Sequence, residues 1–62
     1  MNNSEMLYTI SEVAKLLKVN RTFVYDLINR GEIPAVKVGS LKIRRTTLEK
    51  YLERLEGNEN AG

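Results

Sequence analysis

The chain has 62 residues and a net charge of +2, so it forms one domain at most. A domain of this size buries only about 60% of the surface that its unfolded chain exposes, which leaves little room for a deep substrate pocket. The sequence contains no Cys and no His. This excludes disulfides, thiolate metal sites, and the commonest zinc ligand and general base. We therefore expect no catalytic site, no cofactor, no metal site and no small-molecule substrate.

Targeting signals are also missing from the sequence. No apolar run approaches the roughly 20 residues of a membrane span. The opening MNNSEM lacks the basic and apolar regions of a signal peptide. Together with the lack of Cys, these observations predict a cytoplasmic protein that does not contact a membrane.

Positive charge is concentrated in two windows without acidic residues, 13–25 and 33–48. These windows hold seven of the ten lysines and arginines: Lys15, Lys18, Arg21, Lys37, Lys42, Arg44 and Arg45. Four of the eight acidic residues fall in the last fourteen positions. Clustered cations are the usual footprint of a polyanionic partner, and an ordinary mixed surface is the alternative.

A first helix is predicted over residues 10–17. Thr9 and Glu12 have the spacing of a capping box, in which each side chain bonds the other residue's free backbone N–H. The apolar residues that follow share one helical face, with i, i+3, i+4, i+7 spacing: Ile10, Val13, Ala14 and Leu17.

A second helix is predicted over residues 21–30. Asn20 is a favourable N-cap, and Gly31 is a favourable C′ residue because glycine adopts the left-handed conformation without strain. The inner face is apolar and contains Val24, Leu27 and Ile28. The outer face is polar and contains Thr22, Tyr25, Asp26 and Asn29. We expect Asp26 to pair with Arg30 at i+4, and acceptance from a cytosine amine is the alternative.

A β-hairpin is predicted after Pro34, which disfavours helix and cannot donate within a strand ladder. Its strands are expected at residues 35–38 and 41–44, joined by a two-residue turn, Gly39-Ser40. The alternation places one set of residues toward the core: Val36, Val38, Leu41 and Ile43. It places another set outward together: Lys37, Lys42 and Arg44.

A third helix is predicted to begin at a second capping box, Thr46 and Glu49, and to end at Gly57. Its apolar face contains Leu48, Tyr51, Leu52 and Leu55. The expected organisation is a flexible N-terminus (1–7), one domain (8–56) and a disordered tail (57–62).

Two helices joined by a three-residue turn, with a polar outer face on the second, are typical of a helix-turn-helix, whose second helix enters the DNA major groove. A generic helical hairpin is the alternative. A basic hairpin after such a unit is a wing that presses cations against phosphate, although it can also be a solvated face with edge lysines. The fold class predicted is α+β, mostly α, a winged helix-turn-helix.

Residues 8–52 resemble the excisionase-family helix-turn-helix domain, a small relative of the MerR DNA-binding domain. The matching motifs are T-x-x-E-x-A (Thr9, Glu12, Ala14), V-Y-x-L-I (Val24, Tyr25, Leu27, Ile28), G-x-I-P-A (Gly31, Ile33, Pro34, Ala35), K-V-G (37–39), I-R-R (43–45) and Leu48. The resemblance implies a MerR-like winged helix with the second helix in the major groove. It also implies DNA contacts from Arg21, Thr22 and Tyr25, and from the wing at Lys42 and Arg44.

The resemblance and the charge pattern together predict sequence-specific binding of double-stranded DNA without catalysis. The predicted contact residues are Lys18, Arg21, Thr22, Tyr25, Lys37, Lys42, Arg44 and Arg45. The family includes excisionases, which bend DNA and steer an integrase toward excision of a mobile element, and small transcription regulators. We predict the excisionase role, with an integrase or a second copy as further partners. A transcription regulator and a protein-interaction adaptor are the alternatives.

Overall fold

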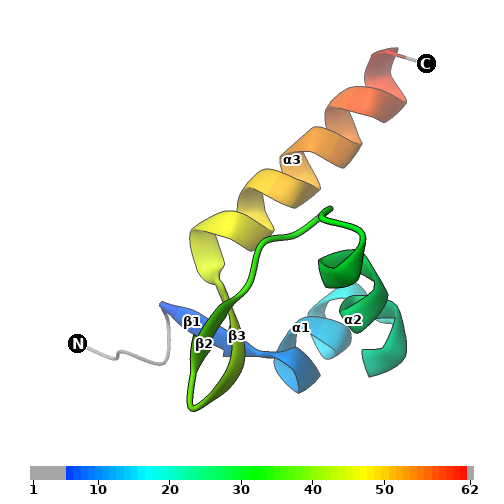
Figure 1. The fold of residues 1–62 in the computed structure, drawn as a ribbon. Helices are drawn as coiled ribbons and strands as arrows, with labels where there is room; N and C mark the ends of the chain where they lie inside the picture. Colours follow the sequence, from blue (N-terminus) through cyan, green and yellow to red (C-terminus); the bar gives the residue numbers. More distant parts are fainter. Residues whose placement is uncertain (1–5, 62) are drawn as a thin grey trace.

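The computed structural model describes the backbone of residues 6–61 and the side chains of residues 6–57. The elements follow in the order β1 (Leu7–Thr9), α1 (Ile10–Leu17), α2 (Arg21–Asn29), β2 (Val36–Val38), β3 (Ser40–Arg44) and α3 (Arg45–Ala61). Figure 1 shows α1 and α2 on one side of a small sheet, and α3 leaving the end of β3 and extending away from the body. The predicted α+β fold of two helices, a hairpin wing and a third helix is confirmed.

Side-chain caps fix the starts of α1 and α2. The Thr9 backbone N–H donates to Glu12 Oε1 at 2.8 Å, and the Glu12 N–H donates to Thr9 Oγ1 at 3.1 Å, which completes the predicted capping box. Asn20 Oδ1 accepts from the Phe23 N–H at 2.9 Å. Gly31 follows α2 with φ of 78°, as a left-handed C′ residue does. These local signals fix where α1 and α2 begin and where α2 ends.

The core consists of eight buried apolar side chains, contributed by both α1 and α2, the loop after α2, β3 and α3. They are Ile10, Val13, Ala14, Val24, Leu27, Ile33, Ile43 and Leu48. Ile33, in the loop after α2, and Ile43, in β3, are fully buried. The loop is therefore anchored in the core, and α2 and the hairpin are held in a fixed relation.

A short N-terminal strand, β1, was not predicted. It pairs antiparallel with β3, with Tyr8 opposite Ile43, and the sheet order is β1-β3-β2. The Arg45 N–H also donates to the Met6 carbonyl at 3.0 Å. The predicted flexible N-terminus therefore ends too late, because Leu7 already lies in β1; residues 1–5 lie outside the described part of the chain.

The hairpin turn is tighter than predicted. Facing residues pair as Val36 with Lys42, Lys37 with Leu41, and Val38 with Ser40. Gly39 alone connects the strands, with φ of 77°, a conformation that glycine adopts without strain. The prediction of a two-residue Gly39-Ser40 turn was wrong, and Ser40 begins β3 instead.

This shorter turn reverses which side chains of β2 face the core. A register shift of one residue turns every side chain of a strand to the other face of the sheet. Val36 and Val38, predicted to be in the core, are 38% and 56% exposed. They share the outer face with Lys42, whereas Lys37 shares the inner face with Leu41. The prediction that Lys37, Lys42 and Arg44 point outward together was therefore wrong for Lys37.

The third helix differs from its prediction at both ends. It begins at Arg45, so Thr46 lies inside the helix, and the side chain of Glu49 pairs with Arg45 (Nε to Oε2, 3.7 Å) rather than capping. It continues through Gly57 to Ala61, so the predicted end at Gly57 was wrong and the predicted tail (57–62) begins within the helix. A lone glycine in a helix is unfavourable by only about 1 kcal/mol relative to alanine.

Of the described side chains of α3, those that pack against the body lie in its first part. Leu48 is buried and Tyr51 is half-buried, but Leu52 and Leu55 are each 41% exposed. Arg54 ties the helix to the loop after α2, since its Nη2 donates to the Glu32 carbonyl at 3.1 Å. Beyond this tie, α3 extends away from the other elements (Figure 1).

Candidate nucleic-acid interface

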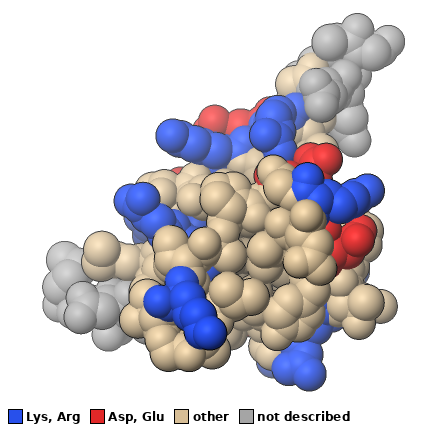
Figure 2. Space-filling view, in the orientation of Figure 1, with Lys and Arg blue, Asp and Glu red and all other residues tan. Residues whose placement is uncertain are grey.

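Charge is unevenly distributed over the surface of the molecule. Figure 2 shows lysine and arginine side chains, and no acidic ones, over the lower part of the view, where Figure 1 draws the hairpin. Acidic side chains appear higher in the same view, near α3 and the end of α2. The two acid-free windows of the sequence thus give a surface region that attracts anions.

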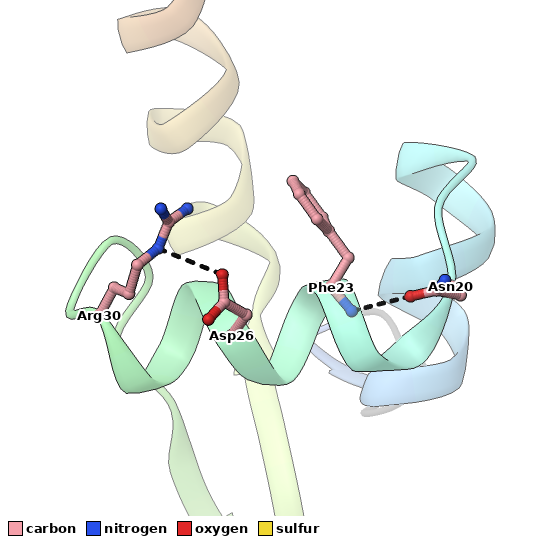
Figure 3. Close-up of polar contacts among 4 residues, drawn as sticks. All are labelled: Asn20, Phe23, Asp26 and Arg30. Carbon is pink, nitrogen blue, oxygen red and sulfur yellow. Dashed lines mark hydrogen bonds and ion pairs between the residues drawn. The ribbon is translucent and has the colours of Figure 1, made fainter.

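One flank of α2 carries its only acidic residue, Asp26. Figure 3 shows Phe23, Asp26 and Arg30 pointing to the same side of the helix. Arg30 Nε lies 3.3 Å from Asp26 Oδ2, which confirms the predicted i, i+4 pair. Both side chains are more than half exposed, so the pair adds little stability. Its effect is to balance the negative charge on α2.

The exposed surface of α2 also presents a cation and two hydroxyl groups, and Thr22 lies one helical turn before Asp26. Arg21 and Tyr25 are one helical turn apart, and Thr22 lies beside them; all three are exposed. Arg21 Nη1 donates to Ser11 Oγ at 3.3 Å, which holds the guanidinium beside the first turn of α1. A guanidinium has five N–H donors, so this contact leaves others for a ligand. The predicted residues Arg21, Thr22 and Tyr25 are therefore brought together.

Lys18 occupies an unusual backbone conformation between the two helices. Its φ of 61° and ψ of 44° are left-handed, and it is the one residue other than glycine with a positive φ among those described. Such a conformation is unfavourable by roughly 1–2 kcal/mol for a residue with a Cβ. The Lys18 side chain is exposed, close in sequence to the start of α2.

The hairpin brings two of its predicted residues together, on the outer face of β3: Lys42 and Arg44. Lys42 Nζ donates to the Val38 carbonyl and to Ser40 Oγ, each at 3.0 Å. Lys37 is exposed on the opposite face. Arg45 lies beyond the hairpin as the first residue of α3, where it pairs with Glu49.

An apolar surface on the outer face of the sheet was missed in the sequence. Met6, Leu7, Val36, Val38 and Arg44 line an open hollow of about 510 Å³. The alternation of the hairpin assigned both valines to the core, and only the turn length distinguishes the two registers. Phe23, 44% exposed on α2, was likewise not predicted as a site residue.

Within residues 6–57, no three potential ligand side chains come together as a metal site. None of the helices described is long and apolar enough to cross a membrane.

A family model described as a helix-turn-helix domain matches residues 7–56. This match covers most of the chain and coincides with the elements from β1 into α3. The chain therefore belongs to the helix-turn-helix domain family.

Three curated relatives extend this assignment. A Saccharopolyspora erythraea protein named "Probable excisionase" is 39% identical over 59 residues, covering 94% of this chain and 60% of that protein. The Mycobacterium tuberculosis "Putative DNA-binding protein Rv0500A" is 42% identical over 48 residues, covering 76% of this chain and 62% of that protein. The Bacillus subtilis "Uncharacterized protein YvgK" is 46% identical over 50 residues, covering 79% of this chain but 16% of that protein.

The chain thus spans less than two thirds of each of these relatives. No solved structure gives a significant match. The predicted resemblance to excisionase-family helix-turn-helix domains is confirmed, and the closer likeness to MerR domains stays a prediction.

Proposed function

We propose that this chain binds double-stranded DNA in a sequence-specific manner, with α2 in the major groove and the β2–β3 hairpin against the backbone. One observation carries the proposal: in a helix-turn-helix chain, α2 exposes Arg21, Thr22 and Tyr25, and its one acidic residue, Asp26, pairs with Arg30. The second helix of such a domain reads base edges with its N-terminal residues. The first two turns of α2 supply these three residues.

The contact residues divide by chemistry. Thr22 and Tyr25 carry hydroxyl groups that can donate to and accept from base edges. Arg21 and Lys18 lie at or just before the start of α2 and suit phosphate. The lysine and arginine side chains of the hairpin also suit phosphate. Lys42 and Arg44 lie on its outer face and Lys37 on its inner face. Arg45 contributes less, because it already pairs with Glu49.

The biological role that we propose is that of an excisionase-like factor, which acts with an integrase in site-specific recombination of a mobile element. The support is the relative named "Probable excisionase", which matches 94% of this chain. A small transcription regulator is the second candidate, favoured by the relative named only as DNA-binding. Both roles use the same DNA-binding surface.

DNA binding is tested by fluorescence anisotropy with a random-sequence duplex at several salt concentrations. If four to six cations contact phosphates, log K falls against log salt with a slope of roughly −4 to −5. No binding at low salt, or a flat salt dependence, contradicts the proposal. The role is tested by adding the protein to a reconstituted excision reaction with any integrase that is encoded beside its gene. Stimulated excision supports the excisionase, and binding without stimulation supports the regulator.

A further inference from the structure

The tip of the wing contains a lysine whose position is fixed by neutral partners. Lys42 Nζ donates to the Val38 carbonyl at 3.0 Å and to Ser40 Oγ at 3.0 Å. Val38 and Ser40 face each other across Gly39, so the ammonium group closes the end of the hairpin. Lys42 is half-buried, whereas Lys37, one position before Val38, is exposed. Lys42, predicted to point outward, lies on the outer face of the wing and is held close to its turn.

This arrangement fixes the charge without neutralising it. A carbonyl and a hydroxyl each accept a hydrogen bond but carry no net charge. Among the described side chains, the salt bridges involve Arg30, Arg45 and Arg54, and Lys42 takes part in none of them. The full positive charge of Lys42 therefore remains available to an anion at the wing tip.

Two hydrogen-bond donors remain unused by these contacts. An ammonium group has three N–H donors, of which two are engaged here. The Ser40 hydroxyl accepts from Lys42, so its own proton is free to donate. Ser40 is exposed, and its Oγ lies 3.0 Å from Nζ. Two oxygen atoms of one phosphate, or one oxygen between both donors, fit such a pair.

We propose that Ser40 and Lys42 form a preformed binding site for a backbone phosphate of DNA, with Ser40 as a direct ligand and the Val38 carbonyl as the group that orients the lysine. The inference rests on the proposed DNA binding and specifies which atoms of the wing perform it. Preorganisation is the advantage of the site, because immobilising a long lysine side chain costs rotamer entropy that opposes binding. Here part of that ordering is already present in the free protein.

Removing either side chain of the site should change DNA affinity, but only the loss of Lys42 should change the salt dependence. Ser40→Ala removes a neutral donor and frees the lysine, so affinity for any duplex falls about two- to tenfold while the salt slope stays unchanged. Lys42→Ala removes a charge, so affinity falls by about tenfold or more and the slope becomes shallower by about one unit. Because the two act as one site, the double variant loses less than the product of the separate losses. Ser40→Thr keeps the hydroxyl and retains most of the affinity.

The experiment is anisotropy of wild type and these four variants on a random-sequence duplex over a salt series, with a thermal melt of each. Lys37→Ala is the matched control, since it removes one cation from the other face of the same hairpin and leaves the Ser40–Lys42 contact intact. The affinity lost in Lys37→Ala is expected to be independent of the affinity lost in Ser40→Ala. The melts identify any variant whose folded fraction has fallen, and affinities are compared at a temperature where all are folded.

The outcomes separate the site from the function. Wild-type protein that binds no duplex contradicts DNA binding itself. Wild-type binding with unchanged affinity for Ser40→Ala and Lys42→Ala overturns the phosphate site and leaves DNA binding in place. Lower melting temperatures with wild-type affinity mean that the contact only stabilises the turn, and this also overturns the site. Independent losses from Ser40→Ala and Lys42→Ala contradict their action as a unit.

Discussion

Replacing Lys18 with glycine is expected to stabilise the fold and weaken DNA binding together. Lys18 holds a left-handed conformation, with φ of 61°, which is unfavourable by roughly 1–2 kcal/mol for a residue with a Cβ. Glycine removes this strain, but it gives the unfolded chain more conformational entropy, which lowers stability by about 0.4–1 kcal/mol. The net gain is about 0.8 kcal/mol, or roughly 3–6 °C in Tm for a domain of this size.

The matched control is Lys18→Ala, which removes the same charge but keeps the Cβ and hence the strain. Both variants should lose affinity for DNA and about one unit of salt slope, because each lacks one phosphate contact. Lys18→Gly should melt at a higher temperature than Lys18→Ala, because only the glycine variant lacks the Cβ. The assays are thermal denaturation followed by circular dichroism, and anisotropy on a random duplex over a salt series.

Two results would refute the reasoning separately. If Lys18→Gly melts no higher than Lys18→Ala, the left-handed conformation stores no strain that glycine can relieve. If both variants bind DNA with the affinity and salt slope of wild type, Lys18 does not contact phosphate. The strained turn would then have no part in DNA binding.

Other changes test the remaining elements of the fold and site. Thr22→Ala or Tyr25→Ala should weaken binding to a preferred sequence by about 1–3 kcal/mol, while binding to a random duplex stays almost as in wild type. A competition assay between the two duplexes measures this, and equal losses on both contradict base reading by α2. Leu27→Ala should lower the free energy of unfolding by about 2–5 kcal/mol through a cavity, measured by denaturant titration, since Leu27 is 2% exposed. Asn20→Ala should cost about 1 kcal/mol through loss of the α2 cap, and an unchanged stability would show that the cap is dispensable.

The sequence predicted those parts of the fold that short-range signals determine. The Thr9–Glu12 capping box and the Asn20 cap lie within three residues of the groups that they bond. They located α1 and the start of α2, and with them the flank that carries the candidate base-reading residues. The Asp26–Arg30 pair followed from the same helical spacing.

Other features depend on contacts between distant segments. The three residues of β1 form a strand because β3 pairs with them, and nothing in a three-residue segment shows this in advance. The wing register depends on whether one or two residues form the turn, and both turns fit Gly39. That single difference decided which face carries Val36 and Val38, and it placed Ser40 beside Lys42.

The strand order also bears on how two copies of the molecule avoid edge-to-edge pairing of their sheets. Within the described residues, β2 pairs only with β3, so its other edge offers unpaired backbone groups beside two exposed valines. If the β2 edges of two copies paired antiparallel in register, Val36 of each would meet Val38 of the other, and the two Lys37 side chains would lie directly opposite. Like charges in that position destabilise a strand pair. Lys37, the wing cation that faces away from Lys42, thus opposes growth of the sheet from one molecule into the next.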